Sequence, residues 1–132
     1  LKLLASTMAS RMEKDVLLCP MIDARRMEVY TSLYTTDLEE IEATTAKIVD
    51  SESFLKYLEK SKVAFFGDGA LKCKDIITHP NALFIPDVHP LASQMVKLSM
   101  HAYEAGQFED VAYFEPFYLK DFVATKPKNK VL

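Results

Sequence analysis

The sequence predicts an α/β domain in which helices pack on a mixed β-sheet. Three patterns lead to this fold class: a β-hairpin whose first strand is an apolar run over residues 17–22 and whose second alternates over residues 27–34, the wholly apolar run Val63–Phe66, and helical spacing between Pro90 and Gly106. The run Val63–Phe66 is typical of a central strand that is covered on both faces. The expected order is strand, strand, strand, helix, strand, strand, helix, which implies a mixed sheet.

The chain opens with an apolar helical stripe. Its members recur at helical spacing: Leu1, Leu4, Ala5, Met8 and Met12. No capping residue precedes them. We therefore expect residues 1–12 to be the tail of a helix that begins upstream, in a longer protein.

A β-hairpin is expected next, with strands over residues 17–22 and 27–34 joined by the charged turn Asp23-Ala24-Arg25-Arg26. The second strand alternates with the period of a half-buried strand. The turn lacks the glycines that would bring backbone amides up to a phosphate. This combination favours a binding or scaffolding domain over a catalyst.

Three elements are expected in the middle of the chain. A β-like segment spans residues 44–49, and Asp50 is placed to cap a helix that ends near Ser61. The buried face of that helix is expected to contain Phe54, Leu55 and Leu58. The strand Val63–Phe66 follows, and Gly67-Asp68-Gly69 ends it.

The last third of the chain contains the clearest helical pattern. Residues 71–77 form a short helix or a packed loop, and residues 82–85 form a strand. Pro90 suits the first position of a helix whose apolar positions recur up to Gly106. The stretch 111–122 is rich in aromatics and broken by a proline, so we expect an extended segment packed on the body.

Composition limits the classes of function. A chain of 132 residues with 49% hydrophobic and 27% charged residues fits one globular domain rather than a disordered one. A net charge of −3 gives no general attraction to nucleic acid. Two cysteines make no disulfide framework, and no apolar run suits a membrane span, so a cytoplasmic protein without membrane contact is expected. Residues 126–132 are locally basic and are expected to form a frayed tail.

Two turns are the candidates for a ligand or partner site. Gly67-Asp68-Gly69 ends a buried strand, where α/β proteins often bind ligands, and its amides could face a nucleotide phosphate. A tight structural turn is the simpler interpretation. Asp23 and Glu28 flank the hairpin turn and could act as an acid and base pair, but Arg25 and Arg26 between them favour a salt-bridged turn or a partner surface.

Metal binding and covalent catalysis have little support in the sequence. His79, His89 and His101 lack the short spacing of common metal sites. No serine lies in a G-x-S-x-G elbow, and neither Cys19 nor Cys73 has a histidine beside it in sequence. We expect no catalytic residue, no metal and no cofactor, and weak nucleotide binding stays open.

Three segments together carry a resemblance to a known family. The hairpin contains IDARRMEVYTSLY, the glycine turn FFGDGA, and the C-terminal stretch FEPFYLKDFVATKPK. In order and approximate spacing these segments resemble the C-terminal half of the bacterial TsaB/YeaZ family across nearly the whole chain. The resemblance implies a ribonuclease-H-like lobe of the two-lobed actin-like ATPase and Hsp70 fold, with residues 1–132 as a single C-terminal lobe.

The tail of the chain matches a motif of that family. The matching residues are Glu115, Pro116, Tyr118 and Leu119. We expect them to be structural, with Phe117 and Leu119 buried and Tyr118 placing its hydroxyl so that the tail closes the lobe.

The resemblance also implies a function. It is that of a non-catalytic scaffold subunit in synthesis of threonylcarbamoyladenosine, the modified adenosine next to the tRNA anticodon. Its expected partners are a homologous catalytic threonylcarbamoyl-transferase subunit and a small ATPase, with indirect tRNA contact and a homodimer of the intact protein. Two enzymatic alternatives stay open: a nucleotide-binding ATPase or phosphotransferase lobe of the same fold, and a glycoprotease-like peptidase.

Overall fold

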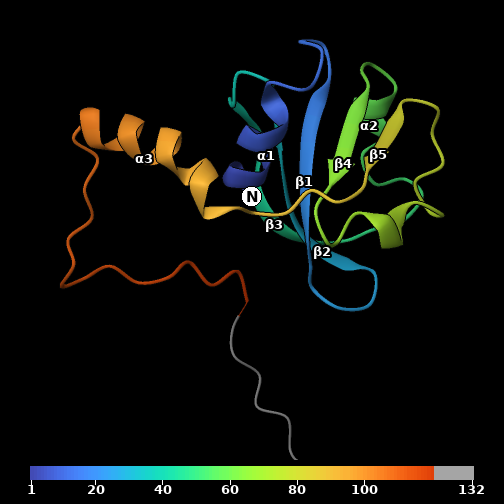
Figure 1. The fold of residues 1–132 in the computed structure, drawn as a ribbon. Coiled ribbons are helices and arrows are strands. Elements are labelled where there is room, and N and C mark those ends of the chain that lie inside the picture. The colour runs from blue at the N-terminus through green and yellow to red at the C-terminus, as the bar shows by residue number, and fades with distance from the viewer. Residues whose placement is uncertain (121–132) are drawn as a thin grey trace, which may run out of the picture.

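The computed structural model describes residues 1–120, and its centre is a five-stranded sheet (Figure 1). The elements in chain order are α1 (Lys2–Ala9), β1 (Leu17–Asp23), β2 (Glu28–Tyr34), β3 (Glu40–Ile48), α2 (Leu55–Leu58), β4 (Val63–Phe66), the 3₁₀ turn η1 (Leu71–Cys73), β5 (Ala82–Ile85), the 3₁₀ turn η2 (Ala92–Gln94) and α3 (Met95–Glu104). The strand order is β3-β2-β1-β4-β5. The pairs β1/β2 and β2/β3 are antiparallel, and β1/β4 and β4/β5 are parallel. The sheet is mixed, which confirms the predicted fold class.

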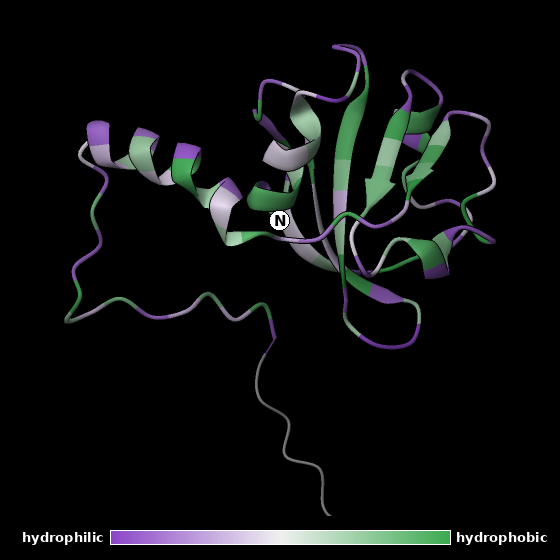
Figure 2. Cartoon of the chain, viewed as in Figure 1, coloured by the Kyte–Doolittle hydropathy of each residue, from purple (hydrophilic) through white to green (hydrophobic). Residues whose placement is uncertain are grey.

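Strand β4 lies at the centre of the core. Val63 and Phe65 face a cluster formed with α2 and η1, whereas Ala64 and Phe66 face a second cluster formed with α1. All four side chains are fully buried. Because both faces of β4 are buried, its sequence is an unbroken apolar run rather than an alternating one. Figure 2 shows its ribbon as hydrophobic along its length.

Helix α1 covers one face of the sheet through the predicted stripe. Leu4, Ala5 and Met8 are buried against the sheet. The helix ends at Ala9, so the expectation of helix through residue 12 was too long. No helix among residues 1–120 is long and apolar enough to cross a membrane.

Two predicted boundaries in the middle of the chain were wrong. Strand β3 begins at Glu40 rather than at residue 44, because Glu40 and Glu42 pair with the end of β2 next to an irregularity in register. Charged side chains are tolerated there since β3 is an edge strand. Asp50 does not cap α2: its Oδ1 accepts hydrogen bonds from the amides of Glu52 and Ser53, which closes a turn before the helix.

The predicted C-terminal helix is present, but it starts later. Helix α3 begins at Met95, after η2, rather than at Pro90. It projects away from the sheet, and the chain beyond it continues as an extended segment (Figure 1). No residue of α3 is buried, so its apolar positions do not face the core of residues 1–120.

The expectation that residues 111–122 pack on the body was also wrong for the part the structure describes. Val111 is 94% exposed, and Phe117, predicted to be buried, is 82% exposed. Leu119 is half-buried. An aromatic-rich sequence indicates an apolar surface that can contact another surface. It does not indicate whether that other surface belongs to the same domain. Residues 121–122 and the predicted frayed tail, 126–132, lie outside the described residues.

Candidate functional site

The carboxyl ends of the parallel strands β1 and β4 bring the two candidate turns together. The amide of Asp23 donates a hydrogen bond of 3.0 Å to Asp68 Oδ1, and the amide of Gly69 donates one of 3.1 Å to the Met21 carbonyl. The glycine turn and the hairpin turn therefore form one continuous surface, although 45 residues separate Asp23 from Asp68 in the sequence.

Both glycines of the turn lie directly against strand β1. A Cβ on Gly67 would lie 2.3 Å from the Met21 carbonyl oxygen, and one on Gly69 would lie 2.9 Å from the Ile22 carbonyl carbon. Gly67 also has a φ of +99°, which side-chain-bearing residues rarely adopt. The space that the missing side chains leave is filled by the chain's own backbone.

The charges around the hairpin turn are paired with lysines from elsewhere in the chain. Asp23 forms an ion pair with Lys72, which also donates a hydrogen bond of 2.7 Å to the Glu28 carbonyl. The carboxylate of Glu28 pairs with Lys120. The hydrogen bond from Lys72 is the main cause that lowers the pKa of Asp23, so its carboxylate is charged at neutral pH.

The sequence predicted a salt-bridged turn or a partner surface around Arg25 and Arg26, and the ion pairs that the structure shows at this turn come from lysines elsewhere in the chain. Within residues 1–120, the ion pairs of Asp23 and Glu28 do not involve Arg25 or Arg26. Arg25 and Arg26 are exposed and have φ values of 71° and 51°, in the left-handed region. The turn thus presents two guanidinium groups to solvent on a strained backbone, an arrangement that suits contact with an acidic partner surface.

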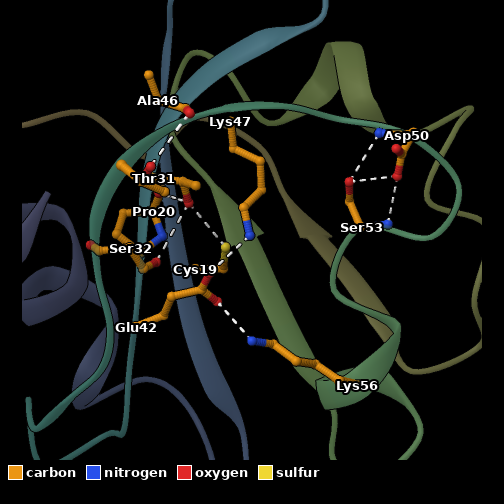
Figure 3. Close-up of polar contacts among 11 residues, drawn as sticks. Cys19, Pro20, Thr31, Ser32, Glu42, Ala46, Lys47, Asp50, Ser53 and Lys56 are labelled. Carbon is orange, nitrogen blue, oxygen red and sulfur yellow. Dashed lines mark hydrogen bonds and ion pairs between the residues drawn. The ribbon is translucent and has the colours of Figure 1, made fainter. Parts of the chain in front are cut away.

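A second polar cluster lies on the sheet face that α2 covers (Figure 3). Lys47 Nζ lies 3.0 Å from Glu42 Oε1 and 4.6 Å from the centroid of the Phe54 ring, and Lys56 Nζ lies 3.8 Å from Glu42 Oε2. Burial tends to raise the pKa of Glu42, but hydrogen bonding and the two lysine charges outweigh it, and the pKa is lowered. This cluster ties the edge strand β3 to α2.

The two cysteines are unsuited to nucleophilic chemistry. Burial raises the pKa of Cys19 to about 12, and its Sγ lies 3.3 Å from the Thr31 hydroxyl, which in turn donates to the Pro20 carbonyl at 2.9 Å. Burial also raises the pKa of Cys73. Both groups are therefore protonated thiols at neutral pH, whereas a nucleophile must be a thiolate.

The tail motif has an open arrangement. Glu115, Pro116 and Tyr118 are exposed. Residues 117–120 border a groove of about 460 Å³, and its other lining residues include Leu1, Ile22, Tyr30, Tyr34 and Thr44. The motif does not form the closed strap that the sequence suggested.

Sequence reasoning found the two turns but missed the lysines that complete them. Nothing in the local pattern around Lys72 or Lys120 marks either as a partner of the hairpin, because the contacts arise from the sheet topology.

Within residues 1–120, no three His, Cys, Asp or Glu side chains lie close enough to hold a metal ion. The arrangement at the strand ends can position a turn and present charge to a partner.

Comparison with solved structures shows a likeness in fold. No protein-family model and no curated protein matches this chain. The fold is similar to the crystal structure of an uncharacterized protein from Pseudomonas aeruginosa with similarity to peptidase YEAZ, with a TM-score of 0.73 and 19% sequence identity. The match covers 91% of this chain and 56% of the other, so this chain spans about half the length of its neighbour. The likeness supports the predicted ribonuclease-H-like lobe of the actin-like fold.

Proposed function

We propose that this chain is the C-terminal, non-catalytic lobe of a scaffold subunit for tRNA threonylcarbamoyladenosine synthesis. In this proposal the complete subunit binds a homologous catalytic threonylcarbamoyl transferase, and a small ATPase acts with the pair. Contact with tRNA is indirect, since a net charge of −3 disfavours a broad phosphate interface.

The observation that carries the proposal is that the turn Gly67-Asp68-Gly69 packs directly against strand β1. A nucleotide at a glycine-rich turn needs free backbone amides and open space above the glycines. Here the Gly69 amide is bonded to the Met21 carbonyl, and the space beside Gly67 is filled by that same carbonyl. The position that an ATPase lobe would use for phosphate is thus occupied by strand β1, which supports a scaffold over a nucleotide enzyme.

Two further observations agree with a scaffold. The structural neighbour is described as similar to YEAZ, and this chain spans about half of it, as expected for one lobe of a two-lobed protein. In addition, the chain exposes large apolar side chains along α3 and the segment after it, including Met95, Val96, Met100 and Tyr103. Surfaces of this kind favour contact with another protein.

The proposal is tested by measuring the amount of threonylcarbamoyladenosine in tRNA. A strain depleted of the full-length protein is expected to lose threonylcarbamoyladenosine from its tRNA, as measured by mass spectrometry of digested tRNA. Re-expression of the full-length protein should restore the nucleoside, and so should a Cys19→Ser variant, because a scaffold needs no thiolate. Unchanged levels of the modified adenosine after depletion would contradict the proposal.

The nucleotide-binding alternative is favoured by the location of the glycine turn at the ends of parallel strands. Calorimetry of the full-length protein with ATP and Mg²⁺ distinguishes the scaffold from the nucleotide-binding enzyme. Heat of binding that disappears in an Asp68→Ala variant would favour the nucleotide-binding enzyme. The absence of any heat at millimolar ATP would contradict that alternative.

A further inference from the structure

A polar groove of about 620 Å³ lies between α1, the loop after β2 and the start of α3. It is separate from the strand-end turns, because none of its lining residues belongs to them. Its walls come from three parts of the chain, and they include Thr7, Arg11, Thr36, Gln94 and Lys97. The Thr7 hydroxyl, nearly buried, is hydrogen-bonded to Gln94 Oε1 at 2.5 Å, which fixes α1 against η2 at the floor of the groove.

The charge of the groove differs from that of the whole chain. The chain has a net charge of −3, yet the described residues that line the groove include two cations and no carboxylate. Arg11 and Lys97 are both exposed, and within residues 1–120 neither forms an ion pair. The nearby Asp37 pairs instead with Lys14, at 3.9 Å.

Besides the apolar Ala9, Leu38 and Leu98, the groove is bordered by five hydroxyl side chains: Ser6, Thr7, Ser10, Thr36 and Ser93. The Ser6 and Thr7 hydroxyls already donate hydrogen bonds within the chain, to the Leu3 carbonyl and, for Thr7, to Gln94 Oε1. The hydroxyls of Ser10, Thr36 and Ser93 are therefore the ones that can donate to phosphate oxygens. A guanidinium, an ammonium and several hydroxyls around one concave surface match the chemistry of a phosphate, which carries charge and accepts many hydrogen bonds. The volume lies in the range of small-molecule sites.

We propose that this groove binds a phosphate group carried by a small phosphorylated molecule, with Arg11 and Lys97 supplying the charge and the surrounding hydroxyls fixing the oxygens. The inference does not rest on the scaffold role, because the groove is remote from the strand-end turns. A protein with either function could hold such a ligand between α1 and α3.

The experiment is a ¹H–¹⁵N NMR titration of the full chain with inorganic phosphate, then with AMP, and finally with a short single-stranded RNA. Phosphate and AMP are expected to shift amide signals of residues 6–11 and 93–98. The double variant Arg11→Gln/Lys97→Gln should weaken AMP binding by about tenfold or more, since charge-assisted hydrogen bonds are lost. Lys74→Gln, which removes one exposed charge far from the groove, should leave the affinity unchanged.

The result also identifies the source of the phosphate. Saturable binding of AMP that weakens in the Arg11→Gln/Lys97→Gln variant supports the proposal. The spectrum of each variant without ligand serves as the control that its fold is kept. Binding of RNA but not of AMP would overturn the small-molecule assignment. Amide shifts that are absent, or equal in Lys74→Gln and the double variant, would overturn the site itself.

Discussion

The strand-end turns and the segment from α3 onward differ in how they use the residues that sequence analysis singles out. At the strand ends, two glycines and two carboxylates are almost completely engaged by the chain's own backbone and lysines. In α3 and the segment after it, apolar side chains of similar prominence face solvent. Within residues 1–120, the polar groups of the first region are bonded to the chain itself, whereas the apolar side chains of the second region are exposed.

This difference separates two kinds of information in a sequence. A glycine pair after a buried strand specifies a local backbone path, so its environment follows from the fold. A run of exposed aromatics specifies only that apolar surface must be covered, and the cover can come from another lobe or another chain. Substitutions in the two regions should therefore differ in their cost to stability.

Phe65→Ala should cost about 3 to 5 kcal/mol in the free energy of unfolding, because a fully buried ring is replaced by a cavity. Phe65 packs edge-on against Phe54 and stacks on Phe84, each at a centroid distance of 5.2 Å. The matched variant Phe117→Ala should change the free energy by less than about 0.5 kcal/mol, since that ring is 82% exposed. Urea unfolding of both proteins checks the contrast, and equal losses would contradict it.

Gly67→Ala should destabilise the protein by about 3 kcal/mol, since the new Cβ meets the Met21 carbonyl and the φ of +99° is strained. Gly106→Ala is the control: its φ is +67°, but no atom lies within 4 Å of the new Cβ. There the cost should be about 1 kcal/mol, from backbone strain alone. Thermal and urea unfolding measure both, and similar costs would show that the turn is not closed against β1.

Asp23 should contribute to the acid sensitivity of the fold. Its pKa is lowered in the folded state, mainly by the hydrogen bond from Lys72, so the unfolded state binds the proton more readily. Stability from this group is present above the ordinary pKa of 3.8 and is lost as the pH falls through the lower folded value. Asp23→Asn should flatten the fall in stability below about pH 4.

The control for this titration is Lys72→Met, which removes the ion-pair partner of Asp23. It should reduce the loss of stability at acid pH in the same way. In the double variant the two effects should not add, because one interaction is lost in each case. Urea midpoints measured from pH 2 to pH 7 provide the comparison. An acid limb in Asp23→Asn identical to that of the unchanged chain would contradict the assigned pair.

Arg25→Gly should have the smallest effect, a gain of about 0.5 kcal/mol. Glycine relieves the left-handed φ of 71°, and the larger entropy of its unfolded chain offsets part of that gain. Arg25→Ala keeps the strain and removes the same charge, so it should give no gain. If both variants stabilise the protein equally, the benefit comes from charge rather than from the backbone.

The sheet could be predicted well because its signals are local and mutually consistent. Val63–Phe66 is apolar without a break, and the alternation after Arg26 requires one buried face. The boundary of β3 was missed because Glu40 and Glu42 are strand residues through their pairing with β2, and single-residue propensity does not register that pairing.

The candidate site could be predicted only in part. Asp23, Glu28 and the glycine turn stand out by composition, and the sheet brings them together. Lys72 and Lys120 are partners at separations of 49 and 92 residues, so no local pattern identifies them. The groove between α1 and α3 was missed for the same reason, since its walls come from distant parts of the chain.

The most direct test of the scaffold proposal is size-exclusion chromatography of the full-length protein, and separately of this chain, with the catalytic threonylcarbamoyl-transferase subunit from the same cell. The full-length protein is expected to co-elute with that subunit. Co-elution of this chain as well would place part of the contact in this lobe, and Arg25 and Arg26 would be the first residues to replace. If the full-length protein elutes alone at micromolar concentrations, the scaffold proposal is contradicted.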